Sequence, residues 1–243
     1  MTFLLTKTPL VIIIVTCNLN SYKFIFLGGI KMRIGIIGAS GKAGNLILKE
    51  AVDRDHEVTA IVRNAGKIEN KEVDVLEKNI FDLKKEDLQK FNVVVNAFNA
   101  PHGEEQQHIE AGRVLIEALK GTDTRVLVVG GAGSLYVDKE EKTRLFDTPD
   151  FPEAYLPTAT NMGKSLEEFK KTEDVKWTHL SPAAFFDPAG KRTGEYKTGG
   201  EQLILNNKGE SYISYEDYAI AVVDEIENPK HIKQRFSVVG EAQ

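Results

Sequence analysis

One stretch near the beginning of the chain, residues 33–44, limits the possible folds more than any other. The apolar run 34–37 is followed by Gly38, Gly41 and Gly44 and then by a helical pattern. Such a run is typical of a strand that is buried on both faces of a parallel sheet. A strand that turns directly into a helix directs unpaired N–H groups and the positive end of the helix dipole toward the turn. The stretch therefore predicts a phosphate-binding loop.

Each of the three glycines has its own predicted role in this loop. The first allows a tight turn, the second lets a pyrophosphate approach the backbone, and the third lets the helix pack closely on the strand. The spacing is G-x-x-G-x-x-G rather than G-x-G-x-x-G, so a loop that is glycine-rich only for turn geometry is the alternative. Because both the strand and the helix are present, we favour a dinucleotide-binding loop. Its predicted cofactor-binding residues are Gly38, Ser40, Gly41, Lys42, Ala43 and Gly44.

The composition indicates an ordinary globular protein and excludes some functions. Hydrophobic residues make up 42% of the 243 residues and charged residues 28%. The net charge of -5 argues against a nucleic-acid partner, because binding to phosphates needs a basic face. Cys17 is the only cysteine, so the chain can form neither an internal disulfide framework nor a thiolate metal site. This suits a cytoplasmic protein, and we predict that location.

The first 31 residues differ from the rest of the chain. They contain three lysines and no acid, and their apolar core, residues 10–15, is too short to span a bilayer. No small-x-small cleavage site follows that core. Residues 28–32 can be encoded by a purine-rich GGAGGT, a short spacer and ATG, as in a bacterial ribosome-binding site. We therefore expect residues 1–31 to be a translated leader or a disordered extension, and residues 32–243 to be the folded domain.

Strands and helices are expected to alternate after the glycine loop. The predicted strands cover residues 57–62, 73–80, 92–98, 125–129, 176–180 and 235–239. The predicted helices cover residues 83–90, 104–119, 159–171 and 214–228. This alternation indicates an α/β fold with a doubly wound, Rossmann-like parallel sheet in a single domain. It breaks at residue 181, and we expect residues 181–243 to form a small, loop-rich, substrate-side portion.

The residue after the second predicted strand bears on the choice of cofactor. In a Rossmann half, an acid at this point binds the ribose 2′-hydroxyl of NAD, whereas an arginine suits the 2′-phosphate of NADP. Here the residue is Arg63, and no acid accompanies it. The sequence thus favours NADPH, with NAD as a second possibility; the alternative is a solvated surface arginine.

Loops that follow the later strands should surround the reactive end of the cofactor. In an open α/β sheet, ligands bind beyond the carboxyl ends of the strands. The predicted residues of these loops are Ala97, Phe98, Gly130, Gly131, Pro182 and Ala183. Phe185 and Phe186 follow the last of them and could stack on a planar substrate, with core packing as the alternative.

Five segments carry a resemblance to a known family: G-A-S-G-K-A-G (38–44), V-V-G-G-A-G-S-L (128–135), D-T-P-D-F-P (147–152), S-P-A-A-F-F (181–186) and I-S-Y-E-D-Y-A (213–219). With them the sequence resembles the atypical short-chain dehydrogenase/reductases. Within this class it is similar to the bacterial NAD(P)H-flavin reductases, which are related to NmrA-like proteins and to flavin/biliverdin reductase B. The resemblance spans the domain and excludes the first 31 residues.

The resemblance also implies where a cofactor lies. It places a nicotinamide dinucleotide in the glycine loop, with the nicotinamide ring near Pro182 and Ala183. It further implies that a residue after the third strand touches the adenine, and by position this residue is Asn79.

The residues leave few kinds of chemistry open. Carbonyl reductases of the short-chain class use a tyrosine four residues before a lysine, and none of the seven tyrosines has a lysine there. Two histidines, His102 and His108, flank acids but do not form H-E-x-x-H, so we expect no metal. Ser134 lacks the G-x-S-x-G pattern of a hydrolase nucleophile. No catalytic residue is predicted.

Two hypotheses of function remain. The first is an NAD(P)H-dependent oxidoreductase that transfers hydride to a flavin or a quinone-like acceptor, since these acceptors delocalise the charge and need mainly orientation. The second is an NmrA-like redox sensor that binds NADP without turnover. Either protein would be a monomer or a homodimer, with no nucleic-acid or membrane partner.

Overall fold

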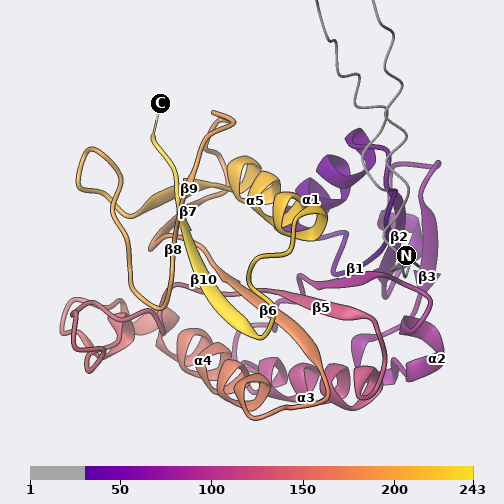
Figure 1. Cartoon of the computed structure of the whole chain (residues 1–243), viewed down its shortest axis with the longest axis horizontal. Coiled ribbons are helices and arrows are strands. Elements are labelled where there is room, and N and C mark those ends of the chain that lie inside the picture. The colour runs from indigo at the N-terminus through magenta and orange to yellow at the C-terminus, as the bar shows by residue number, and fades with distance from the viewer. Residues whose placement is uncertain (1–30, 243) are drawn as a thin grey trace, which may run out of the picture. The chain divides into compact units, whose positions relative to one another are not determined.

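The computed structural model describes residues 31–242 of the chain (Figure 1). The predicted leader, residues 1–31, lies outside the described residues except for Lys31. None of the helices within the described part has the length and apolar character that crossing a membrane requires.

An eight-stranded sheet forms the centre of the described residues. Its order is β3–β2–β1–β4–β5–β6–β10–β8, and all neighbours are parallel except β8, which runs antiparallel to β10. The strands are β1 (Arg33–Ile37), β2 (Glu57–Val62), β3 (Asp74–Glu77), β4 (Val93–Asn96), β5 (Arg125–Val129), β6 (Lys176–Ser181), β8 (Lys197–Gly199) and β10 (Gln234–Val239). Two further strands, β7 (Phe185–Asp187) and β9 (Tyr212–Ser214), pair in parallel as a small separate sheet.

Helices cover both faces of the large sheet (Figure 1). One face carries α1 (Lys42–Asp53) and α5 (Tyr215–Glu227), which pack against each other. The opposite face carries α3 (Gln107–Leu119) and α4 (Leu156–Lys170), with the short α2 (Lys85–Leu88) beside α3. Each face has its own apolar core, because the parallel strands are buried on both sides. This confirms the predicted doubly wound α/β fold.

Several boundaries differ from those predicted, and local polar contacts explain them. The third strand is shorter than residues 73–80, because the side chain of Asn79 caps a 3₁₀ turn, η2 (Ile80–Asp82). Helix α3 begins at Gln107 rather than residue 104, after turns in which the Glu105 carboxylate accepts a hydrogen bond from the Gly103 N–H. Side-chain bonds of this kind compete with regular structure at the ends of elements.

The sheet order locates the site. Within the described residues, the chain forms β1 first, adds β2 and β3 outward on one side of it, and then returns to form β4 on the other side of β1. Such a reversal leaves a crevice outside the carboxyl ends of the two central strands. Three further 3₁₀ turns complete the fold: η1 (Ala65–Lys67), η3 (Leu145–Asp147) and η4 (Glu153–Tyr155).

Candidate functional site

A cleft of about 1030 Å³ lies at the carboxyl ends of β1, β4, β5 and β6. Twelve of the sixteen residues predicted for the site line it: Gly41, Lys42, Ala43, Gly44, Ala97, Phe98, Gly130, Gly131, Pro182, Ala183, Phe185 and Phe186. The other four, Gly38, Ser40, Arg63 and Asn79, are not part of its lining. The lining is mainly apolar, and the volume of the cleft lies at the upper end of the range for small-molecule sites.

The glycine loop is held by close contacts between backbone segments. Gly38 has φ of +76°, and a Cβ built on it would lie 2.5 Å from the carbonyl oxygen of Ala97. The Gly38 carbonyl accepts a hydrogen bond from the Gly41 N–H, and a Cβ built on Gly44 would overlap this carbonyl. Both positions therefore require glycine for the loop to exist at all.

Gly41 differs, because its surroundings are open on the cleft side. A Cβ at this position would meet only the Gly38 oxygen, at 3.2 Å, while the residue itself lines the cleft. Gly41 is the N-cap of α1 but supplies no side-chain acceptor, and the first turn contains no acid. The first N–H groups of α1 are thus left for an anion, which the helix dipole also favours. These residues fit a dinucleotide phosphate.

Two loops form the floor of the cleft. After β4, the Asn96 side chain accepts a hydrogen bond from the Phe98 N–H at 3.1 Å, and the Phe98 ring packs against those of Phe81 and His108. After β5, Gly130 lies so close to the His179 ring that a Cβ would overlap it.

His179 was not singled out from the sequence, yet it supports this floor. The residue is 2% exposed, and its Nδ1 has no partner among the described residues. Burial, and then the nearby charge of Arg235, lower the pKa of His179 to about 3. The ring is therefore neutral at physiological pH. Arg235 also donates to the Ser134 Oγ at 2.8 Å, so Ser134 is a buried structural hydroxyl.

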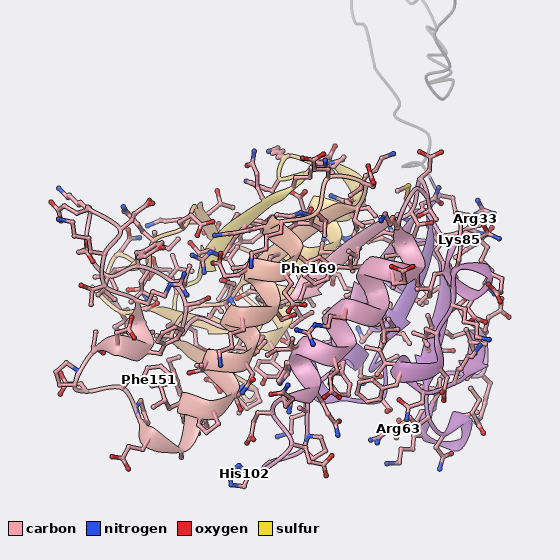
Figure 2. The ribbon with its side chains drawn as sticks, turned by 90° about the horizontal axis from the view of Figure 1, so that it is seen from below. Arg33, Arg63, Lys85, His102, Phe151 and Phe169 are labelled. Carbon is pink, nitrogen blue, oxygen red and sulfur yellow. The ribbon has the colours of Figure 1, made fainter. Side chains whose placement is uncertain are left out.

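Two predicted residues for the adenosine half lie outside the lining. Arg63 is exposed directly after β2, and within residues 31–242 no hydrogen bond or ion pair involves it. Figure 2 shows it at the same edge of the molecule as His102 and Phe151, opposite the edge of Arg33, where β1 begins. Asn79 follows β3 and its Oδ1 accepts a hydrogen bond from the Phe81 N–H, so only its amide nitrogen is uncommitted.

The other end of the cleft is aromatic. The predicted Phe185 and Phe186 lie there, and Phe185 is 61% exposed, which argues against core packing for it. Three aromatic residues that received no role from the sequence also line this end: Phe151, Tyr155 and Tyr215. They fall in or beside two segments that carry the family resemblance, residues 147–152 and 213–219. That signal could have identified them.

The histidines and acids near residue 105 do not converge on a metal site. His102 is exposed and pairs with Glu105 at 3.2 Å, whereas His108 is buried. Burial lowers the pKa of His108 more than the charge of Glu105 raises it. Among residues 31–242, no group of three or more histidine, cysteine or acidic side chains could hold a metal ion.

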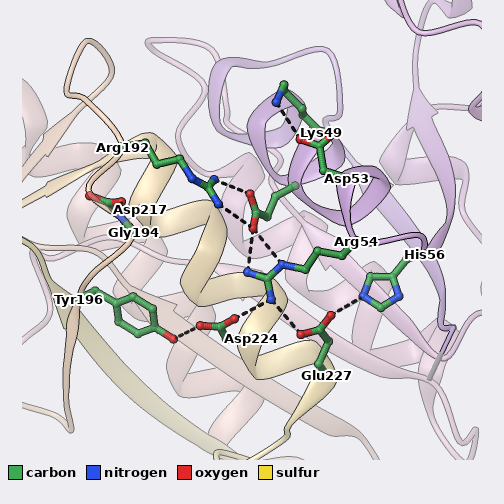
Figure 3. A network of polar contacts seen from close by, with 11 residues as sticks. Lys49, Asp53, Arg54, His56, Arg192, Gly194, Tyr196, Asp217, Asp224 and Glu227 are labelled. Carbon is green, nitrogen blue, oxygen red and sulfur yellow. Dashed lines mark hydrogen bonds and ion pairs between the residues drawn. The ribbon is translucent and has the colours of Figure 1, made fainter. Parts of the chain in front are cut away.

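A polar network fixes α1 from the side opposite its phosphate end (Figure 3). Arg54 bonds the buried Glu50 and, on α5, Asp224 and Glu227, at 2.7–2.9 Å. Arg192, from the loop before β8, also bonds Glu50, at 2.5 Å. Burial acts to raise the pKa of Glu50, but the hydrogen bonds from the two arginines lower it overall. The network joins α1, α5 and the loop before β8.

Comparisons with known proteins agree with this geometry. Residues 38–229 match the family model described as NAD(P)H-binding. YwnB of Bacillus subtilis (strain 168), an uncharacterised protein, is 62% identical over 213 residues, which are 87% of this chain and 100% of YwnB.

Two solved structures are similar over nearly their whole length. A Streptococcus pneumoniae TIGR4 protein, provisionally named an NADH-flavin reductase, is 44% identical, with a TM-score of 0.83 over 86% of this chain and 100% of its own. A Bacteroides thetaiotaomicron protein, provisionally named an epimerase, is 35% identical, with a TM-score of 0.78 over 88% of this chain and 99% of its own. The chain therefore belongs to the NAD(P)H-binding family, among the atypical short-chain dehydrogenase/reductases that its sequence resembles.

Proposed function

We propose that the protein is an NADPH-dependent reductase that transfers hydride to a flavin or a quinone-like acceptor. The observation that carries this proposal is the division of one cleft into two chemically different ends. One end offers backbone N–H groups at the start of α1, and the other offers aromatic rings. Membership of the NAD(P)H-binding family supports an oxidoreductase, and the name of the Streptococcus pneumoniae relative supports a flavin as the acceptor.

The lining lacks a histidine and a tyrosine–lysine pair, and this favours an acceptor that needs little proton chemistry. The lining contains one lysine, Lys42, and it belongs to the glycine loop rather than to the aromatic end. The lining has no histidine, and its tyrosines, Tyr155 and Tyr215, have no lysine four residues later. When bound, a reduced nicotinamide supplies the hydride, and the protein holds the planar acceptor against it.

Arg63 supports the preference for NADPH over NADH. It follows β2 at the position that approaches the ribose 2′ substituent in Rossmann folds. Its guanidinium has no partner in the described part of the chain, and this leaves its donors available for a phosphate.

A redox sensor that binds NADPH without turnover is the second candidate. The same lack of a histidine and a tyrosine–lysine pair in the lining favours it, because a sensor needs only the binding function. Under both hypotheses we place the protein in the cytoplasm, since residues 32–243 contain no cysteine and NADPH is an intracellular reductant. We also propose that it is a monomer or a homodimer.

Steady-state oxidation of NADPH, followed by its absorbance, tests the proposal. Riboflavin, FMN and 1,4-naphthoquinone would each serve as acceptor, and calorimetry would measure NADPH binding. We expect binding together with acceptor-dependent oxidation. Tight binding without oxidation of any acceptor would favour the sensor, and failure to bind either nicotinamide dinucleotide would overturn both candidates.

A further inference from the structure

Tyr215 occupies a special position at the aromatic end of the cleft. It is the first residue of α5, and its ring lies against that of Phe186, with centroids 3.9 Å apart. Figure 1 shows α5 on the opposite face of the sheet from α4, which follows Tyr155. The two tyrosines that line the cleft therefore belong to opposite walls.

The position of Tyr215 is fixed by the backbone on both sides of it. Strand β9, directly before it, pairs with β7, so that Phe186 lies opposite Ile213. The Ser211 hydroxyl accepts a hydrogen bond from the Ala184 N–H at 3.0 Å. Ser214 then caps α5 by accepting a bond from the Asp217 N–H. These contacts lock Tyr215 beside the segment 182–186, where the nicotinamide ring is expected.

The hydroxyl of Tyr215 has no hydrogen-bond partner among residues 31–242, although the ring is half-buried. Two other hydroxyls of the lining already take part in hydrogen bonds: Thr148 donates to the Leu145 carbonyl, and Ser211 accepts from the Ala184 N–H. Tyr155 is 67% exposed. Tyr215 thus combines a fixed ring in the lining of the cleft with a hydroxyl that has no hydrogen-bond partner among residues 31–242.

The surroundings keep this phenol protonated. Burial raises the pKa of Tyr215 above its ordinary value. The residue four positions later is Ala219, so no lysine opposes the effect. A neutral phenol at this place can donate a hydrogen bond to an acceptor at every physiological pH.

We propose that the Tyr215 hydroxyl is a catalytic hydrogen-bond donor, which stabilises the negative charge that develops on a carbonyl oxygen of the acceptor during its reduction. This inference rests on the proposed function. The hydride brings two electrons and one proton to the acceptor, which becomes an anion, and the second proton comes from water. Tyr215 keeps its own proton throughout. A fixed donor aimed at developing charge is among the strongest contributions that a protein makes to catalysis.

Binding of two quinones by the NADP-loaded protein gives a test that needs no turnover. 1,4-Naphthoquinone is neutral, and its 2-hydroxy derivative is an anion at pH 8. A hydrogen bond to a charged group corresponds to about a tenfold to hundredfold change in affinity. Tyr215→Phe keeps the ring and removes the hydroxyl. We expect it to lower the affinity for the anion by about tenfold or more and the affinity for the neutral quinone by less than twofold.

Tyr155→Phe is the matched control, since it removes a hydroxyl from the other wall of the same cleft. It should leave the ratio of the two affinities unchanged. Equal losses of affinity for the two quinones in Tyr215→Phe would indicate a packing role and overturn the inference. Equal effects of Tyr215→Phe and Tyr155→Phe on the two affinities would overturn it as well. A wild type that binds neither quinone would also overturn it.

The kinetic arm separates this inference from the proposed function. With 1,4-naphthoquinone as acceptor, Tyr215→Phe should lower kcat by about tenfold to a hundredfold with KM nearly unchanged. A selective loss of affinity for the anion in Tyr215→Phe, in a protein that oxidises no NADPH, would overturn the proposed function and leave the donor role standing. An active enzyme whose kcat is unaffected by Tyr215→Phe would overturn the donor role alone.

Discussion

The two ends of the cleft are built in different ways. The phosphate end consists of one continuous segment, residues 38–44, whose shape is set by backbone contacts such as that between Gly41 N–H and the Gly38 carbonyl, at 2.9 Å. The aromatic end is assembled from three segments that are far apart in sequence and contribute side chains: Phe151, Phe186 and Tyr215 are examples. The shape of the phosphate end therefore depends on glycines that lack side chains, whereas the shape of the aromatic end depends on the side chains themselves.

This difference has consequences for substitutions. A backbone-built site tolerates almost no added atom, whereas a side-chain-built site changes by degrees with the shape and charge of each residue. We therefore expect large effects at the phosphate end and graded effects at the aromatic end. Variants in both regions test this contrast.

Gly41→Val should produce the largest effect, a loss of dinucleotide affinity of more than about a hundredfold, because its side chain would occupy the space of a phosphate oxygen. The fold should persist, since a Cβ here meets only one atom, at 3.2 Å. Calorimetry and thermal unfolding would measure the two properties. Gly200→Val, where a Cβ meets nothing within 4 Å, is the control and should bind normally. Unchanged affinity in Gly41→Val would mean that the loop is only a turn.

His179, beneath the floor between the two ends, should make stability depend on pH. Its pKa is about 3 in the folded protein, whereas an ordinary solvated histidine has a pKa of 6.5, so between these limits the unfolded chain binds a proton that the native protein does not. The contribution of His179 therefore favours folding above pH 6.5 and declines as the pH falls, by about 1.4 kcal/mol per pH unit. His179→Gln should flatten the dependence of unfolding free energy on pH between 6 and 4 in urea titrations. Equal slopes in both proteins would contradict the buried neutral ring.

Arg63→Ala should lower the affinity for NADPH by about tenfold to a hundredfold, because it removes one charge-assisted contact with the 2′-phosphate. NADH lacks that phosphate and should bind the variant as it binds the wild type. The loss should shrink at high salt, because Arg63 is exposed. Binding of both dinucleotides at two salt concentrations would measure this. A wild type that prefers NADH would show that the assignment to NADP is wrong.

Asp150→Asn should give the smallest effect, at the aromatic end. Asp150 is exposed in the lining, and the surrounding segment 145–155 contains three acids and no base. Its charge should disfavour acceptors with a phosphate, so we expect the variant to improve KM for FMN by about twofold to fivefold and to leave riboflavin unchanged. Asp74→Asn, at the start of β3, is the control. An equal gain for both flavins would indicate a change in shape instead of charge.

The sequence by itself predicted the local structure at the phosphate end, whereas the binding of a phosphate there stays a prediction. The strand, the three glycines and the helix lie within residues 33–53, so that spacing and residue type are sufficient to predict their order. The turn at Gly38 also depends on a distant segment, since its N–H bonds the Ile61 carbonyl. The doubly wound sheet followed in the same way, from strands whose apolar runs are buried on both faces. The ends of β3 and α3 were predicted less well, since the side chains of Asn79 and Glu105 fix them through contacts that periodicity does not reveal.

Only the tertiary structure decided which side chains meet at the aromatic end and beneath the floor. Tyr215 lies in a segment that carries the family resemblance, but its contact with Phe186 depends on the pairing of β7 with β9, which the sequence does not reveal. His179 likewise gains its low pKa from burial and from the charge of Arg235, which lies opposite it on β10, a strand far from β6 in the sequence but paired with it in the sheet. Local backbone geometry can be deduced from sequence because its causes are adjacent residues. Long-range contacts, burial and the pKa values that follow from them exist only once the chain has folded.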